Sequence, residues 1–285
     1  MLEGLEGVGR VTTRKVLSNF DSIDAIRRYP REQVLNRLKG VPNAAKLVER
    51  LLDIDGIASE TNETRKRVEA WTGRRIRIRT FLDADWPEAL NTLPNPHRPN
   101  AVFSYGDQEL IAAPVAAIIG KQDLGEHAFA ASERLIRTLV DEGVRINTGL
   151  STGFDVVALK LTSETETPSV VVASSGLARV EQKMRPFASQ LAKAGGLMIS
   201  SFPMDHGPFE HDHRESYLVQ AAMGRAVVFI EPKSDSVEWA ALEWALERGR
   251  AVFAISEDEL PARVHIVSDA IDMEWVVAAV KHVGR

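Results

Sequence analysis

Two short glycine-containing stretches hold the residue types that bind anions. Gly120-Lys121-Gln122 follows the apolar run 115–119, and Thr-Gly-Leu-Ser-Thr-Gly at 148–153 follows a second apolar run at 144–146. Backbone N–H groups in such loops, together with the helix N-termini after them, bind phosphate groups. Neither loop matches the dinucleotide or P-loop pattern, so ordinary structural turns are the alternative interpretation. We predict one anion pocket lined by Gly120, Lys121, Gln122, Gly149, Ser151 and Gly153, with Asp155 beside it.

The segments that position these loops alternate between strand and helix patterns. After Gly125, apolar residues return at helical spacing: Phe129, Leu135, Ile136, Leu139 and Val140. Further strands are expected at 169–173, 196–201, 226–230 and 251–255, separated by helices within 179–195, 213–223 and 239–249 and followed by a helix at 270–282. This alternation predicts an α/β fold with a doubly wound, mostly parallel Rossmann-like sheet over residues 73–285.

The first part of the chain predicts a small all-α domain of helix-hairpin-helix character at residues 1–72. Gly7-Val8-Gly9 precedes a helical pattern, and a weaker copy, LKGVPNAAKLVERLL, follows at 38–52. A small helical bundle without a binding role is the alternative, above all for the second copy. The first hairpin is expected to contact phosphates without reading sequence, through Gly7, Gly9, Arg10, Arg14 and Lys15.

The charge distribution and the composition limit the classes of protein to which this chain can belong. Residues 1–80 hold 17 Lys/Arg against 11 Asp/Glu (+6), which leaves 18 against 29 (−11) for the remainder and −5 in total. The alternating stretch RIRIR at 75–79 predicts an edge strand with one basic face, either a guard against edge-to-edge aggregation or a track for phosphates. The absence of cysteine excludes disulfides and thiolate sites, and no apolar run reaches membrane-spanning length, so we expect a cytoplasmic protein without a membrane partner.

The order of these parts resembles the DprA/Smf DNA processing family, within the Rossmann-like SLOG superfamily. The lead-in LDADWPEALNTLPNPHRPNAVFSYGD is similar to that family's Tyr-Pro-containing lead-in, and the two loops stand where the family has V-G-[ST]-R and S-G-[LM]-A-x-G-[IV]-D-x-x-A-H. The stretches 199–203 and 229–254 resemble two later family patterns. The resemblance implies that the protein binds single-stranded DNA and helps to load a RecA-type recombinase during DNA uptake or recombination. It leaves open whether the protein forms a homodimer.

The chain departs from the family pattern at polar positions. Gln122 replaces the arginine of the first loop, Leu159 replaces a histidine, and Ser201 replaces an acidic residue. Ser216, Tyr217 and Leu218 stand over the Arg-Asn-Arg of the family's F-P-x-R-N-R run. We expect Arg214 to substitute as a cation, Tyr217 to offer a stacking face, and DNA binding to be weaker than in other family members.

The sequence leaves three alternatives to this function. His206, His211, Asp212 and His213 cluster, but without an i, i+4 pair no metal site is predicted. No Ser/His/Asp arrangement is evident and His127 is expected at the surface, so no catalytic residue and no cofactor are assigned. A nucleotide glycosidic hydrolase would need Asp155 or Glu238 as its carboxylate, and a nucleotide- or nucleic-acid-sensing module of the same superfamily is the main rival.

Overall fold

A computed structural model describes residues 1–120, 123–151, 153–165 and 167–281. The chain forms two compact units, each described here by itself. Unit 1 contains residues 1–76 and 94–100, and unit 2 contains residues 77–93 and 101–285. Among the described residues, no helix combines the length and the apolar character that crossing a membrane requires.

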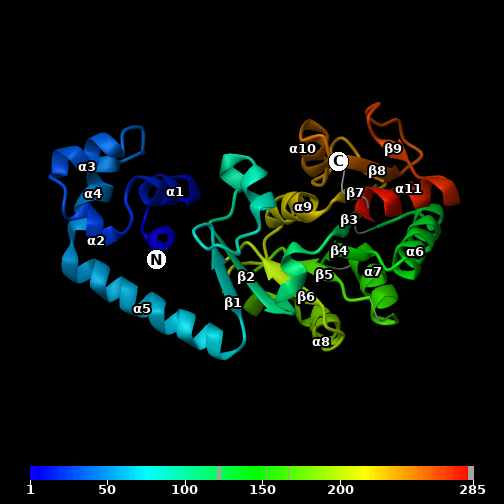
Figure 1. Cartoon of the computed structure of the whole chain (residues 1–285), viewed down its shortest axis with the longest axis horizontal. Helices are drawn as coiled ribbons and strands as arrows, with labels where there is room; N and C mark the ends of the chain where they lie inside the picture. The colour runs from blue at the N-terminus through cyan, green and yellow to red at the C-terminus, as the bar shows by residue number, and fades with distance from the viewer. Residues whose placement is uncertain (121–122, 152, 166, 282–285) are drawn as a thin grey trace. The chain divides into compact units, whose positions relative to one another are not determined.

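Unit 1 is helical, as the sequence predicts. Its core consists of aliphatic side chains with Phe20, and Ile26, Val34, Leu38, Val48 and Leu51 are fully buried. The elements, coloured blue to cyan in Figure 1, are η1 (Leu2–Gly4), α1 (Arg10–Asn19), α2 (Ile23–Ile26), α3 (Arg31–Arg37), α4 (Ala44–Leu52), α5 (Ile54–Gly73) and η3 (Asn95–His97).

The two hairpins of unit 1 share one turn geometry. Gly7 and Gly40 both adopt positive φ, 77° and 82°, which favours glycine at each position. The N–H of the next residue then donates to a carbonyl three residues back, Val8 to Leu5 and Val41 to Leu38, both at 3.0 Å. The second copy, which appears weaker in sequence, is therefore a genuine hairpin, and it lies between α3 and α4, whereas only the short η1 precedes the first.

Unit 2 is built on one sheet in the order β1-β2-β6-β5-β4-β3-β7-β8-β9. The pairs β1–β2 and β2–β6 are antiparallel, and all other pairs are parallel. The predicted doubly wound, mostly parallel α/β class is thus confirmed. The strands are β1 (Arg77–Thr80), β2 (Ala101–Gly106), β3 (Val115–Gly120), β4 (Arg145–Gly149), β5 (Val170–Val172), β6 (Leu197–Ser200), β7 (Ala226–Ile230), β8 (Ala251–Ile255) and β9 (His265–Ile266).

Helices cover both faces of this sheet (Figure 1). One face packs on α9 (Asp212–Met223) and α10 (Trp239–Glu247), and η2 (Glu88–Thr92) and η4 (Gln108–Ala112) lie on the same side. The other face packs on α6 (Glu126–Asp141), α7 (Phe154–Ser163), α8 (Arg185–Lys193) and α11 (Ala270–Lys281). The short helices η5 (Leu177–Arg179) and η6 (Gln182–Met184) lead into α8.

Two details of unit 2 differ from the sequence expectation. Phe129, placed on the inward face of its helix by spacing, is 40% exposed on α6, and Ala128 and Ala131 are buried instead. The two-residue strand β9 was not predicted, because a strand of this length leaves no periodic pattern to detect.

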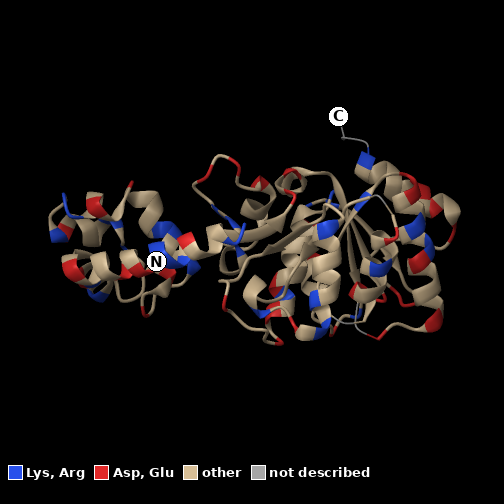
Figure 2. Cartoon of the chain, turned by 90° about the horizontal axis from the view of Figure 1, so that it is seen from below, with Lys and Arg blue, Asp and Glu red and all other residues tan. Residues whose placement is uncertain are grey.

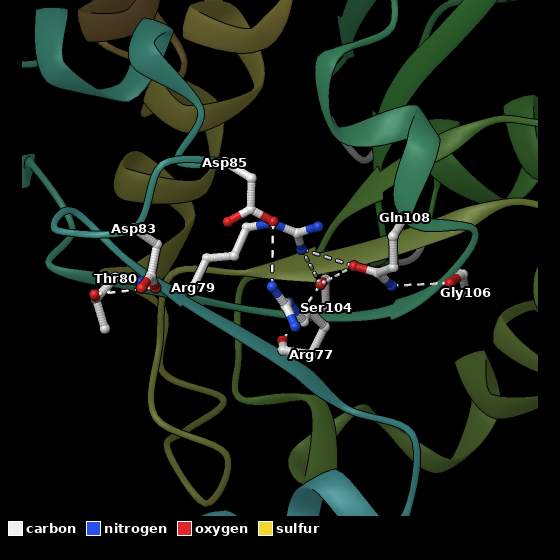
Figure 3. Close-up of polar contacts among 8 residues, drawn as sticks. All are labelled: Arg77, Arg79, Thr80, Asp83, Asp85, Ser104, Gly106 and Gln108. Carbon is white, nitrogen blue, oxygen red and sulfur yellow. Dashed lines mark hydrogen bonds and ion pairs between the residues drawn. The ribbon is translucent and has the colours of Figure 1, made fainter.

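Residues 77–79 of the stretch RIRIR lie in the edge strand β1, as predicted, whereas Arg75, with φ of 63°, and Ile76 precede the strand. One arginine of the predicted basic face is buried. Arg79 on β1 is 4% exposed, and its guanidinium donates to Asp85 Oδ2 at 2.8 Å, Gln108 Oε1 at 2.7 Å and Ser104 Oγ at 3.2 Å (Figure 3). Burial alone would raise the pKa of the Asp85 carboxyl, but the hydrogen bond and charge of Arg79 outweigh it and lower that pKa. The phosphate-track interpretation is therefore wrong for Arg79, which fastens the lead-in segment to the sheet.

This role separates Arg79 from its neighbour Arg77, whose side chain is 57% exposed and lies 3.4 Å from the same carboxylate. We expect Arg79→Met to lower the free energy of unfolding by about 1–3 kcal/mol, because it removes buried hydrogen bonds. Arg77→Met should change it by less than about 0.5 kcal/mol, as for an exposed ion pair. Urea titration of both variants measures the difference, and equal effects would contradict the assignment.

Candidate functional site

The first predicted loop begins where β3 ends. Gly120 is buried, and a Cβ at this position would lie 2.7 Å from the ring of Phe154, the first residue of α7. Only glycine therefore lets the end of β3 pack against the start of α7, and this contact brings the two predicted loops together. Lys121 and Gln122 lie outside the described residues.

A carboxylate lies at the N-terminus of the helix that follows this loop. Gly125, the N-cap of α6, donates its N–H to Glu231 Oε2 at 3.3 Å. Glu231 follows β7 with φ of 48°, and its own N–H donates to the carbonyl of Ile255 at 2.8 Å. A negative charge is favoured at a helix N-terminus, so the protein itself supplies an anion where the sequence suggests a phosphate.

The second predicted loop is organised by Asp155, which is 6% exposed in the first turn of α7. Its Oδ1 accepts from Thr148 Oγ1 at 3.0 Å and from the Gly149 N–H at 3.1 Å. Its Oδ2 accepts from the Ser151 N–H at 3.0 Å and from Ser151 Oγ at 2.6 Å. Asp155 thus holds the loop closed.

This arrangement limits what Gly149, Ser151 and Gly153 can offer to a ligand. The N–H groups of Gly149 and Ser151 already donate to Asp155, and a Cβ on Gly149 would lie 2.4 Å from Asp155 Oδ2. Gly153 is the N-cap of α7 with φ of 74°, a conformation that favours glycine. That these residues bind a phosphate stays a prediction, and the donors expected for it serve the loop in this structure.

Arg214 and Tyr217 lie on α9, one turn apart. Arg214 is exposed and lines a groove together with His211 and Trp239. Tyr217 packs partly buried against the core, and burial followed by the charges of Asp155 and Glu238 raises the pKa of its phenol. Arg214 is therefore available at the surface, whereas only part of the Tyr217 ring could stack on a base.

A series of packed aromatic rings, here called the aromatic ladder, precedes α9 and consists of Phe202, His206, Phe209 and His211. The rings of Phe202 and His206 stack with centroids 4.8 Å apart, and those of Phe209 and His211 stack at 5.6 Å, with Phe209 52% exposed. Buried Asp212 fixes the ladder, since its Oδ2 lies 2.9 Å from His206 Nε2 and its Oδ1 lies 3.4 Å from His211 Nε2. Within the described ranges no group of three His, Asp or Glu side chains is arranged to hold a metal ion.

Asn147 and Gln220 are buried polar residues that no sequence motif indicated, and Glu238, considered above as a carboxylate for glycosidic cleavage, is buried as well. Asn147, Gln220 and Glu238 are 0%, 1% and 4% exposed, and Asn147 Nδ2 donates to the Gln220 carbonyl at 3.2 Å. Asn147 Oδ1, both amide atoms of Gln220 and Glu238 Oε1 find no hydrogen-bond partner in the described part of the chain. The available signal was a polar residue inside an apolar run, as in YLVQAAM, but such a signal does not specify partners.

The two carboxylates considered for glycosidic cleavage are both enclosed. Asp155 accepts four hydrogen bonds from described residues, and Glu238 is buried at the N-cap of α10. A general acid or base must reach the proton it transfers. Neither carboxylate is placed to do so in this conformation. His127, by contrast, is 77% exposed at its side chain, as expected.

The predicted cations of the first hairpin are engaged within unit 1. Arg14 donates to Asn100 Oδ1 and to the Pro99 carbonyl, both at 2.7 Å, and Lys15 donates to the Lys39 carbonyl beside the second hairpin. Burial and the nearby Arg98 lower the pKa of Arg14 to about 10. Gly7 and Gly9 have open space around them, and Arg10 begins α1. Phosphate contact by this hairpin stays a prediction, in which Arg14 and Lys15 would have to leave their present partners.

The fold and the loops together define a class. A doubly wound, mostly parallel sheet with glycine loops at the carboxyl ends of two adjacent parallel strands defines a Rossmann-like protein. Within that class, the family described as DNA recombination-mediator protein A matches residues 77–271. The chain belongs to this family.

Sequence similarity to individual proteins supports this family membership. The chain is 27% identical over 158 residues to Protein Smf of Escherichia coli, covering 55% of this chain and 42% of that protein. It is 25% identical over 176 residues to the DNA processing protein DprA of Streptococcus pneumoniae, covering 62% of this chain and 61% of that protein. The chain therefore spans less than two thirds of these relatives.

Solved structures share the fold. The structure of DprA from Streptococcus pneumoniae superposes with a TM-score of 0.72 at 22% identity and covers 96% of this chain and 94% of that one. A structure of DNA processing protein A from Helicobacter pylori, described for its single-stranded DNA binding mode, gives a TM-score of 0.60 at 16% identity and covers 72% of this chain and 96% of that one.

The four hydrogen bonds accepted by Asp155 generate a stability prediction. Asn at this position keeps one acceptor oxygen but turns an amide NH₂ toward the Ser151 donors. We expect Asp155→Asn to lower the free energy of unfolding by about 2–4 kcal/mol, measured by urea denaturation. Asp141→Asn at the exposed C-terminal end of α6 is the matched control. A variant as stable as its parent would show that the loop closes without this carboxylate.

Proposed function

We propose that this chain is a DNA processing protein that binds single-stranded DNA at the carboxyl edge of its parallel sheet. The observation that carries the proposal is the meeting of two glycine loops at the ends of adjacent strands β3 and β4, beside the strand-order reversal between β3 and β7. Open α/β sheets bind ligands in the crevice at such a reversal. Family membership supports DNA as the ligand, and the Helicobacter pylori relative is described as binding single strands.

The charge of unit 2 predicts that DNA binds at a small local site and not along a broad basic surface. Residues 81–285 carry 18 Lys/Arg against 29 Asp/Glu, a net −11, and Figure 2 shows both signs interspersed along the elements of unit 2. Asp155 and Glu231 add negative charge at the loops themselves. A phosphate therefore needs a nearby cation, and exposed Arg214 at the start of α9 supplies one.

The finer parts of the proposal come from the family resemblance. Assistance in loading a RecA-type recombinase onto the bound strand would follow from DNA binding, and strand exchange measured with and without this protein tests it. The resemblance leaves a homodimer open, and light scattering across a concentration series tests for it. A nucleotide-sensing role on the same fold remains the rival, and a thermal-shift screen of nucleotides against oligonucleotides separates the two.

Arg214 provides the test of the binding site. Arg214→Ala should weaken binding of a labelled single-stranded oligonucleotide by about tenfold or more, because charged hydrogen bonds to phosphate are strong. The log–log salt dependence of affinity should also become shallower by about 0.7 for the lost phosphate contact. Fluorescence anisotropy at several salt concentrations gives both values.

Arg134→Ala on the exposed side of α6 removes the same charge away from the proposed site and should change neither value appreciably. If both arginine variants weaken binding equally, the effect comes from overall charge and Arg214 is not in the site. If the parent binds no oligonucleotide, DNA binding is the wrong function.

A further inference from the structure

A groove of about 630 Å³ lies beside α9, within the size range of small-ligand clefts, about 300–1,000 Å³. One wall is the start of α9 with the residues before it, and includes His211 and Arg214. The other wall is the connection after β7 with the first turn of α10, and includes Val237 and Trp239. The groove thus opens at the same sheet edge as the two loops.

Flat aromatic surfaces border this groove. The Trp239 indole is partly buried and held in place by a hydrogen bond from Nε1 to Glu243 Oε1 at 3.1 Å. On the opposite wall, His211 stacks in parallel on Phe209, which is 52% exposed. Aromatic side chains of this kind stack on nucleobases, whichever base is present. The shape therefore suits the planar part of a nucleotide.

The charges of the groove exclude a phosphate backbone from running along it. Three carboxylates, those of Glu210, Asp235 and Glu243, line the groove against the single guanidinium of Arg214. Arg214 forms no ion pair with any residue in the described part of the chain. One phosphate at Arg214 is favoured, whereas further phosphates between the carboxylates would be repelled.

Exposed carboxylates distinguish among bases. They accept hydrogen bonds from amino groups such as N4 of cytosine, whereas thymine presents the O4 carbonyl at that position and offers a carboxylate no donor there. Glu210 and Asp235 line the same groove as Trp239, so a base stacked on Trp239 would have these carboxylates among its neighbours. Selectivity for amino-bearing bases follows from these carboxylates, while the stacking surfaces themselves are indifferent to sequence.

We propose that the groove between α9 and the β7–α10 connection holds one base of the bound single strand and prefers cytosine to thymine. This inference rests on the proposed function, because the strand must already be bound at the loops and Arg214. It adds a base preference to the proposed DNA binding. The groove that provides this preference is acidic, whereas a surface that binds phosphates in general is basic.

The test compares short labelled oligo(dC) and oligo(dT) by anisotropy at neutral pH. The parent should bind oligo(dC) about three- to tenfold more tightly. Glu210→Ala combined with Asp235→Ala should bring the ratio close to one, because the amino acceptors are lost while repulsion of both strands falls equally. Asp141→Ala with Glu142→Ala, at the C-terminal end of α6, removes the same charge and should leave the ratio unchanged.

Trp239 supplies a second readout. Trp239→Leu should weaken binding of both oligonucleotides, and Trp239→Phe, which retains a flat ring, should recover most of it. A ratio near one in the parent, or a ratio that survives the double alanine variant, overturns the inference while DNA binding stands. If Trp239→Leu leaves oligonucleotide binding unchanged, the groove serves another partner, such as a basic peptide. A parent that binds neither oligonucleotide refutes the proposed function itself.

Discussion

The fold of unit 2 depends on β3. All six of its residues are buried, and its backbone pairs in parallel with β4 on one side and β7 on the other. The chain builds the sheet outward from β3 to β6 and then returns to the other side for β7 and β8. As a result, α6 after β3 and α10 after β7 cover opposite faces, and the connections leading to them diverge. A crevice at this point is thus a consequence of strand order, before any polar residue is considered.

The protein's own carboxylates then decide what the crevice can accept. Asp155 and Glu231 each lie at the start of a helix, where backbone donors and the helix dipole favour negative charge. An incoming phosphate has to compete with them or bind beside them. Competition with Asp155 would break the four hydrogen bonds that it accepts from described residues, so under the proposed function a phosphate binds beside Asp155, with Arg214 as the proposed cation.

The sequence predicts the fold better than the site for a physical reason. Apolar runs such as 115–119 and 226–230 specify strands locally, because a buried parallel strand must be apolar on both faces. The partner of a polar side chain is set by residues distant in the chain. Arg79 is buried by Ser104 and Gln108, and Asn147 meets Gln220, over separations that no local pattern encodes. The loop pattern predicts a phosphate role for Gly120 and Gly149, which stays a prediction, whereas the packing of these glycines against Phe154 and Asp155 is visible only in the structure.

The departures from the family pattern have different structural consequences. Leu159, at the position of a family histidine, is 3% exposed and packs in the cluster formed by α7, α8 and β5. Ser201, at the position of an acidic residue, donates its hydroxyl at 2.6 Å to Glu215 on α9, so a carboxylate still lies at this place but comes from another element. Leu159 thus lies in the core, whereas Ser201 lies beside a carboxylate that belongs to another element. Because Glu215 follows Arg214 directly, this hydrogen bond also links the β6–α9 connection to the helix that carries the exposed cation.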